Sequence, residues 1–238
     1  MTDTAKKAIF LYDFTGLMAQ PWLDAVYECW LFDGQHEPGV KREGNLVKVG
    51  MWFHHGQIHR HAADIAQMVG SGVEMVFGFP ECTDLTVAGA KHWAGKRKAD
   101  PEFQGKAMRL ALLTEYVALM CGSGKATKWA FENPVGALST MYRRPNFMFH
   151  PHEYAGYLPE NDVHPLYPDI YPGRDRYTKK TCIWSGGGFR EPNRRGYSPL
   201  SKDNPGWKLC GGKSQRTKNI RSATPRGFAI AVYEANHD

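Results

Sequence analysis

Short apolar runs alternate with segments of helical periodicity along the first 136 residues of this chain. The apolar runs predict buried strands at 8–12, 27–32, 45–53, 73–77 and 129–134. Helices are predicted at 58–69 and 104–120, where apolar residues recur at helical spacing. The segment 37–44, between the second and third runs, is turn-rich. This alternation predicts an α/β fold, with a largely parallel sheet and helices on both faces.

The chain changes in character from residue 143 onward. Segment 143–176 is rich in proline, histidine and aromatic residues, which predicts an irregular but well-packed region. A late strand is predicted at 179–184, followed by a long loop or small lobe at 185–214, where glycine, proline and basic residues are frequent. Residues 228–235 indicate a closing helix or strand, and the preceding Pro225 favours a helix.

Composition narrows the class of protein further. With 238 residues and a hydrophobic share of 42%, the chain can form one domain with a smaller appended region. No segment has the pattern of a signal peptide or a membrane span, so no membrane association is expected. The five cysteines are widely spaced, which favours a reducing cytoplasm over a disulfide framework. The histidine cluster at 54–61 lacks a cysteine or carboxylate at familiar zinc spacing, so no metal site is predicted.

Two strand ends carry groups that can perform chemistry. The segment Phe79-Pro80-Glu81-Cys82-Thr83 follows the run at 73–77, and the run at 129–134 ends in Glu132-Asn133-Pro134. In an open α/β sheet the carboxyl ends of parallel strands share one crevice. The Cys82 thiol and the Glu132 carboxylate can therefore converge on one ligand, which suggests covalent catalysis.

Four short motifs follow predicted strand ends or the last loop: Asp13-Phe14-Thr15-Gly16-Leu17, Phe79-Pro80-Glu81-Cys82, Phe131-Glu132-Asn133-Pro134 and Ser222-Ala223-Thr224-Pro225. In this order they resemble the Phe-x-Gly, Pro-Pro-Cys, Glu-Asn-Val and closing motifs of the DNA cytosine C5-methyltransferases, in the short version carried by bacteriophages. The chain departs from the family pattern at five places. Glu81 replaces a proline, Met18-Ala19 replace two glycines, and Arg221-Ser222 replace a Gly-Asn pair. The family's acidic residue after its third strand has no clear counterpart near Met51-Trp52, and its arginine-rich motif appears as Tyr177-Thr178-Lys179-Lys180-Thr181.

The resemblance implies a class I S-adenosylmethionine-dependent methyltransferase fold, Rossmann-like with a mostly parallel sheet, plus a small irregular recognition region. It implies methyl transfer from S-adenosylmethionine to C5 of cytosine in DNA. Cys82 would add to C6 of an extruded base while Glu132 hydrogen-bonds to N3. Lys180 takes the place of the family's cation that contacts the base. The residues implied to bind the cofactor are Phe14, Thr15, Gly16, Asp33, Pro80, Ser222 and Thr224.

The position of Asp33 in the chain also makes it a candidate for cofactor binding, independently of the resemblance. It ends the second predicted strand, where acidic residues of nucleotide-binding α/β folds accept hydrogen bonds from ribose hydroxyls. The alternative is that Asp33-Gly34 forms only a β-turn. The glycine of the motif that contains Phe14 and Gly16 likewise suits either a close backbone approach to the cofactor or a plain strand-to-helix turn.

Positive charge is concentrated late in the chain. The formal net charge of +6 favours a polyanionic partner only weakly, but 185–218 is strongly basic and lies where the resembled family inserts its target-recognition region. We expect this region and the segment after Cys82 to contact double-stranded DNA through Arg190, Arg194, Arg195, Lys213, Arg216, Lys96 and Arg97. The expected division is a catalytic core at 1–184, the recognition region at 185–218 and a returning segment at 219–238. We expect a monomer in the cytoplasm of a bacterial host cell.

Two rival functions stay open on the sequence. Glu81 in place of proline suits transfer of a different group, or action on RNA or a nucleotide. The missing glycines and the altered arginine motif suit a DNA-binding relative that has lost turnover. The mass of the modified nucleoside and the formation of a covalent adduct with 5-fluorocytosine DNA distinguish these functions from plain methylation.

Overall fold

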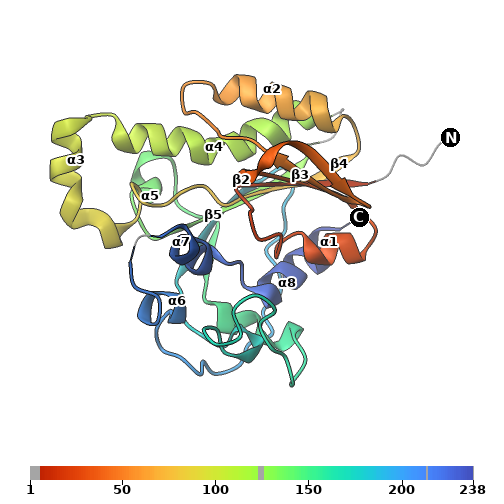
Figure 1. Cartoon of the computed structure of the whole chain (residues 1–238), viewed down its shortest axis with the longest axis vertical. Helices are drawn as coiled ribbons and strands as arrows, with labels where there is room; N and C mark the ends of the chain where they lie inside the picture. Colours follow the sequence, from red (N-terminus) through yellow and green to blue (C-terminus); the bar gives the residue numbers. More distant parts are fainter. Residues whose placement is uncertain (1–5, 123–125, 213, 238) are drawn as a thin grey trace.

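The computed structural model describes residues 6–122, 126–212 and 214–237. Within these residues the strands form one seven-stranded sheet, in the order β3-β2-β1-β4-β5-β7-β6 (Figure 1). The strands are β1 (Lys7–Leu11), β2 (Glu28–Glu43), β3 (Leu46–Gly50), β4 (Val73–Gly78), β5 (Lys128–Pro134), β6 (Phe147–Phe149) and β7 (Thr181–Gly186). The order β2-β1-β4-β5 is parallel, whereas β7 runs antiparallel to β5 and β6 antiparallel to β7. The prediction of a largely parallel sheet is therefore confirmed.

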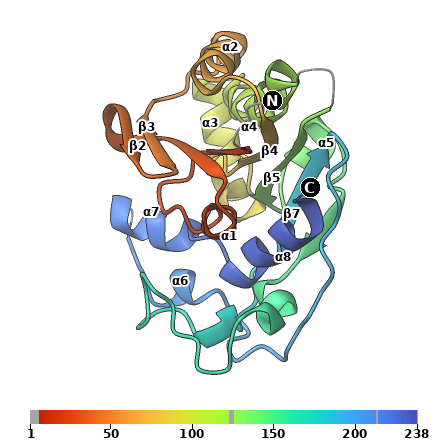
Figure 2. The ribbon, with the colours of Figure 1, turned by 90° about the vertical axis from the view of Figure 1, so that its right-hand side faces the viewer.

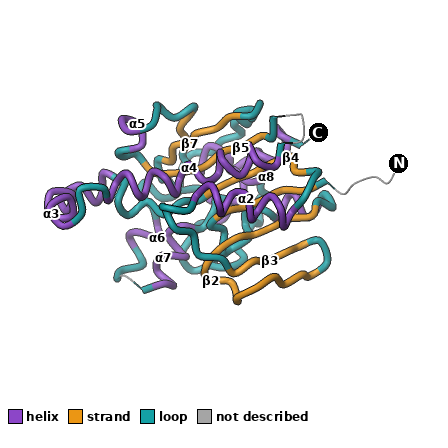
Figure 3. Tube along the Cα trace, turned by 90° about the horizontal axis from the view of Figure 1, so that it is seen from above, coloured by secondary structure: helices purple, strands orange, loops and turns teal. Residues whose placement is uncertain are grey.

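Helices cover both faces of the sheet, as the alternation of strands and helices predicts. In the described ranges they are α1 (Gln20–Asp24), α2 (Ile58–Val69), α3 (Trp93–Ala99), α4 (Phe103–Cys121), α5 (Leu138–Met141), α6 (Pro205–Lys208), α7 (Gln215–Ser222) and α8 (Arg226–Asn236), with 3-10 helices η1 (Val87–His92), η2 (Pro151–Tyr157) and η3 (Gly173–Asp175). Figures 1 and 3 show α2 and α4 on one face, and Figure 1 shows α1 and α8 on the other. One apolar cluster includes Ile65 of α2 and Val117 of α4, and a second includes Trp22 of α1 and Phe228 of α8.

The predicted helix at 58–69 forms as α2 because its apolar side chains share one face. Ile58, Ala62, Ile65 and Val69 recur every three or four residues, and all four are buried. The helix ends at Gly70, whose φ of +71° is a conformation that glycine adopts without a steric penalty. The helices predicted at 104–120 and 228–235 form in the same way, as α4 and α8.

The expectation that 37–44 consists of turns is wrong. β2 continues through this segment and folds back along the outer edge of β3, where Val40 lies opposite Val49 and Arg42 opposite Val47. Pro38 is compatible with this strand because an edge strand needs no hydrogen-bond donor on its open side. Turn-forming residues thus lie inside an exposed edge hairpin, which local composition alone does not distinguish from a loop.

The segments that follow β6 and β7 pack below the sheet, together with α6 (Figures 1 and 2). A third apolar cluster, which includes Leu17, Tyr171 and Ile220, joins them to the chain after β1. The Arg226 guanidinium at the start of α8 pairs with Asp162 at 2.6 Å and Asp175 at 3.0 Å. The proposed division at 184 and 218 stays a prediction, although the sheet ends close to the first boundary and α7 crosses the second. None of the helices in the described ranges is long and apolar enough to cross a membrane.

Candidate active site

The loops after β1, β4 and β5 build the candidate site at one edge of the sheet. The strand order reverses between β1 and β4, since β2 and β3 lie on one side of β1 and the later strands on the other. In open α/β sheets, ligands bind at such a reversal, outside the carboxyl ends of the strands. The N–H of Phe79 donates to the carbonyl of Leu11 at 3.0 Å, so the loop after β4 begins beside the end of β1.

The loops that carry Cys82 and Glu132 are bound to each other. The Asn133 amide donates to the carbonyl of Pro80 at 3.1 Å, and the N–H of Ala137 donates to the carbonyl of Leu85 at 2.8 Å. Gly136 lies so close that a Cβ on it would stand 1.9 Å from the Leu85 carbonyl oxygen. Backbone contact therefore sets the separation of the two loops, and the Asn133 side chain joins them by its hydrogen bond to Pro80.

The structure brings the Cys82 thiol and the Glu132 carboxylate into one electrostatic environment. Cys82 is half-buried. Burial, together with the negative charge of Glu132, raises the pKa of the Cys82 thiol to about 11, and the positive charge of Lys179 acts in the opposite direction. A thiol, a carboxylate and an ammonium group from three different segments thus meet at this edge.

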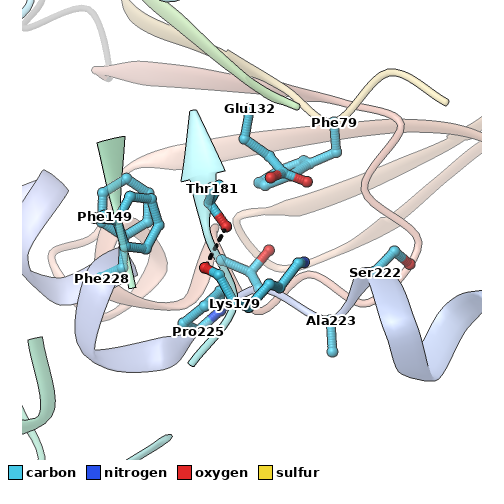
Figure 4. Close-up of a pocket in the computed structure, with 10 residues that line it drawn as sticks. Phe79, Glu132, Phe149, Lys179, Thr181, Ser222, Ala223, Pro225 and Phe228 are labelled. Atoms are coloured by element: carbon cyan, nitrogen blue, oxygen red, sulfur yellow. Dashed lines mark hydrogen bonds between the residues drawn. The ribbon is translucent and has the colours of Figure 1, made fainter. Parts of the chain in front are cut away.

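A small pocket opens beside Glu132 and Lys179 (Figure 4). It is lined by Phe79, Glu132, Phe149, Lys179, Thr181, Ser222, Ala223, Thr224, Pro225 and Phe228. The buried Oε2 of Glu132 accepts no hydrogen bond from any described residue. An unpaired buried oxygen of this kind costs free energy, which a ligand can recover by hydrogen bonding to it.

The lysine in the pocket is Lys179, whereas the sequence motif placed Lys180 in that role. Lys179 lines the pocket and its Nζ donates to the carbonyl of Arg221 at 3.3 Å. Lys180 is exposed and does not line the pocket. Neighbouring side chains of an extended segment point to opposite sides, so a shift of one residue exchanges them. The sequence identified the segment but not which of its two lysines faces inward.

Asp13 is buried just after the carboxyl end of β1, beside the reversal of strand order. Its Oδ1 accepts hydrogen bonds from the Gly16 N–H at 2.8 Å and the Thr15 hydroxyl at 3.1 Å, which shapes the turn after β1. Its Oδ2 has no hydrogen-bond partner in the described part of the chain. Burial raises the pKa of Asp13 to about 6, and the charge of Asp33 adds to the shift. Asp13 belongs to the quoted motif, but sequence reasoning did not assign it a binding role.

Phe14 and Asp33 lie near the same sheet edge, Phe14 after β1 and Asp33 in the neighbouring β2. The Phe14 ring is 41% exposed and stacks on His36, with 5.6 Å between the ring centres. The buried Asp33 carboxylate accepts the N–H of Gln35 at 2.7 Å, and burial raises its pKa. His36 was not singled out from the sequence, and its position three residues after Asp33 is the one signal that could have identified it.

The segment between α7 and α8 returns to the candidate site. Ser222 and Thr224 line the pocket with Glu132, while their role in cofactor binding stays a prediction. α7 is joined to β2 because the Asn219 amide donates to the Gln35 side-chain oxygen at 2.9 Å. The chain therefore returns to the sheet edge at this motif.

Two groups of predicted DNA-contacting residues lie near the site. Lys96 and Arg97 are on α3, which extends from the body of the molecule beyond the loop that carries Cys82 (Figure 1). Lys96 forms an ion pair with Asp84. Arg216 is exposed on α7. Lys213 lies outside the described residues.

The other predicted DNA contacts are not brought to the site. The N–H of Arg190 donates to the Asn236 side chain at 2.8 Å, at the far end of α8. Asn236 also accepts from Lys128, the first residue of β5, at 2.8 Å. Arg190 is therefore beside the amino ends of the strands, opposite the edge that carries Cys82.

Arg194 and Arg195, in the same stretch, are paired with carboxylates. Arg194 contacts Glu153 at 3.2 Å, and Arg195 contacts Glu234 of α8 at 3.2 Å. These contacts attach the loop after β7 to the body of the protein. The sequence pattern showed a dense basic run, but these partners lie 39 to 41 residues away along the chain, where charge patterning is not informative.

Comparison with models of known protein families finds no matching family, and a search of curated proteins finds no similar one. The established result is a mixed α/β fold with a seven-stranded sheet in the described chain. Function must therefore be inferred from the groups that converge at the sheet edge.

Proposed function

We propose that this protein is an S-adenosylmethionine-dependent methyltransferase of the class I fold that methylates C5 of cytosine in DNA. The observation that carries the proposal is that Glu132 and Lys179 line one pocket and that both act electrostatically on the Cys82 thiol. These groups lie at the sheet edge beside the reversal of strand order, where open α/β sheets bind their ligands. A nucleophile, an acid and a cation are the groups that covalent activation of a pyrimidine requires.

The side chains at the sheet edge beside this reversal suit the chemistry of S-adenosylmethionine. S-adenosylmethionine supplies an electrophilic methyl group when it is bound. Asp13 has an unpaired carboxylate oxygen for the ammonium group, and Asp33 is placed for ribose hydroxyls. The exposed Phe14 ring offers a surface for adenine. Ser222 and Thr224 form the side of the site that faces the pocket.

Cys82 begins the reaction when its thiol proton passes to the Glu132 carboxylate and sulfur forms a bond to C6 of the cytosine ring. The electron pair of the C5–C6 double bond moves toward N3, which takes that proton from Glu132. C5 would then take the methyl group as the sulfonium becomes a neutral thioether. Loss of the C5 proton to water, with return of the N3 proton to Glu132, restores the double bond as sulfur leaves C6. Because the ring must be reached from both faces, the base has to leave the duplex stack.

The raised pKa of Cys82 makes Glu132 central to this chemistry. With a pKa of about 11, Cys82 is a thiol at neutral pH, partly because of the nearby carboxylate charge. A neutral Glu132 no longer opposes the negative charge on sulfur, and Lys179 stabilises that charge. When Glu132 is hydrogen-bonded to N3 of the base, its negative charge is reduced. Activation of the base and formation of the Cys82 thiolate are therefore coupled.

The decisive experiment supplies duplex DNA and S-adenosylmethionine with a labelled methyl group, followed by digestion to nucleosides and mass spectrometry. We expect 5-methylcytosine from the wild-type protein and from Cys210→Ser, and none from Cys82→Ser. A nucleoside of another mass would indicate transfer of a different group. Absence of any modified cytosine, on DNA that contains all short sequence contexts, would reject the proposal.

A further inference from the structure

Trp207 of α6 is an exposed aromatic side chain held in a defined position. Its indole is 59% exposed, and the Arg221 guanidinium lies 4.7 Å from the ring centre. Arg221 also donates to the carbonyls of Gly206 at 3.3 Å and Cys210 at 2.5 Å. One face of the indole is therefore occupied by a cation that is itself anchored to the backbone on either side.

α6 has a firm backing beneath Trp207. Gly206 packs so closely on Tyr171 that a Cβ there would stand 2.5 Å from the phenol oxygen. Tyr171 is buried, and its hydroxyl donates to the carbonyl of Ile220 at 2.6 Å. The indole is thus presented to solvent from a rigid base, and its position costs little further ordering when a ligand binds.

The pocket and Trp207 share a wall. Lys179, which lines the pocket, donates to the carbonyl of Arg221 at 3.3 Å, and Ser222, the next residue, lines the pocket as well. Arg221 therefore has its backbone against the pocket and its side chain beneath Trp207. Figures 1 and 2 show α6 close to α7 below the edge of the sheet.

The surroundings of Trp207 are cationic. Exposed basic side chains on α6, α7 and the preceding loop are Lys202, Lys208, Arg216 and Lys218. Two of these have acidic partners, since Lys208 lies 3.5 Å from Asp203 and Lys218 lies 4.0 Å from Glu81. An open aromatic face among cations suits a ligand that combines flat rings with a negative backbone, which is the chemistry of a nucleic acid.

We propose that Trp207 stacks on a nucleobase of the bound DNA, adjacent to the base that enters the pocket. The proposal rests on the proposed function. Arg221 supports one face of the indole while a base covers the other, and the nearby lysines neutralise phosphates of the same strand. Stacking of this kind tolerates any base, so Trp207 would contribute to the affinity for DNA and to its orientation. Sequence specificity would depend on other contacts.

The test is hydroxyl-radical footprinting of the full chain, with and without duplex DNA, read by mass spectrometry of the peptides that contain Trp207 and Leu119. The exposed Leu119 is the internal control, because it is 68% exposed near the end of α4, which precedes the amino end of β5 and so lies opposite the edge that carries Cys82. We expect oxidation of Trp207 to fall at least threefold on DNA binding and that of the peptide with Leu119 to stay unchanged. RNA in place of DNA shows whether protection is specific to the proposed substrate.

Substitution provides the second measurement. Trp207→Ala should raise the Kd for duplex DNA roughly tenfold, equivalent to about 1.4 kcal/mol, whereas Trp207→Phe should recover most of the affinity. Circular dichroism confirms that each variant is folded. If the wild-type protein methylates DNA while Trp207 stays fully oxidised, or Trp207→Ala binds normally, this inference fails alone. If the wild-type protein neither binds nor methylates DNA, the proposed function fails with it.

Discussion

Reactivity at the residue scale depends on opposing charges around one sulfur. Burial and Glu132 hold the Cys82 proton in place, and Lys179 favours its release. Glu132 itself keeps an unpaired buried oxygen. The free protein therefore holds Cys82 as a thiol of low reactivity next to a carboxylate whose neutralisation would favour the thiolate.

The charge balance at Cys82 predicts opposite effects of two substitutions. Glu132→Gln should lower the pKa of Cys82 and Lys179→Met should raise it. A change of about 1 kcal/mol in either interaction alters the thiolate population about fivefold. Alkylation of Cys82 by iodoacetamide between pH 7 and 10, followed by peptide mass spectrometry in a Cys210→Ser background, measures both effects. A shift of both pH profiles in the same direction would contradict this account.

Asp13 predicts a pH dependence of cofactor binding. Its pKa of about 6 means that it becomes protonated below pH 6, and the protonated form cannot pair with an ammonium group. Binding of S-adenosylmethionine should therefore be about tenfold weaker at pH 5 than at pH 7. In Asp13→Asn, affinity should be low at both pH values. Isothermal titration calorimetry gives the Kd, with exposed Asp24→Asn as the control that keeps the wild-type profile.

At the scale of secondary-structure elements, the loops after β4 and β5 hold the reactive side chains in place through backbone contacts. The chain after β4 and the chain after β5 are joined by hydrogen bonds on both sides of Gly136, and an isolated bridge links Thr86 to Gly136. Cys82 and Glu132 come from different strands, yet their relative position is set by these contacts. Such pairing preorganises the two groups before substrate binds.

Gly136→Ala tests whether the close approach of these loops matters. The added Cβ would stand 1.9 Å from the Leu85 carbonyl oxygen, so the loops must separate. We expect a loss of about 1–3 kcal/mol in the free energy of unfolding, and loss of the covalent adduct with 5-fluorocytosine DNA. Gly95→Ala on α3, where an added Cβ meets nothing within 4 Å, is the matched control and should keep both. A wild-type melting temperature and full adduct in Gly136→Ala would show that the close approach is unimportant.

In the whole molecule, basic side chains lie on two separate surfaces. Lys96, Arg97 and Lys98 on α3 extend beside the candidate site, whereas Arg194 and Arg195 are paired with carboxylates on other segments. An ion pair within the protein reduces the charge that is available to phosphates. The basic surface beside the site is therefore the one on α3, whereas sequence composition indicated the stretch that contains Arg194 and Arg195.

Salt dependence distinguishes these two surfaces. If α3 contacts phosphates, the double variant Arg97→Gln with Lys98→Gln should lower the slope of log K against log salt concentration by about 2. Arg194→Gln with Arg195→Gln should leave that slope unchanged, provided thermal melting shows that the variant is folded. Fluorescence anisotropy with a labelled duplex at several salt concentrations measures both. The reverse result would support the sequence-based assignment of Arg194 and Arg195 to DNA contact.

Sequence by itself determined the α/β class, the main helices and the strands that end in Cys82 and Glu132, because burial leaves a periodic pattern in the chain and parallel strands share one carboxyl edge. Tertiary structure decided which neighbouring lysine enters the pocket, since one residue of register reverses the side that a side chain faces. It also decided that Arg194 and Arg195 are paired at a distance and that 37–44 joins the sheet edge. The ion-pair partners Glu153 and Glu234 lie 41 and 39 residues away along the chain, and the edge strand forms because β3 offers an open edge to pair with, so neither outcome is encoded in local composition.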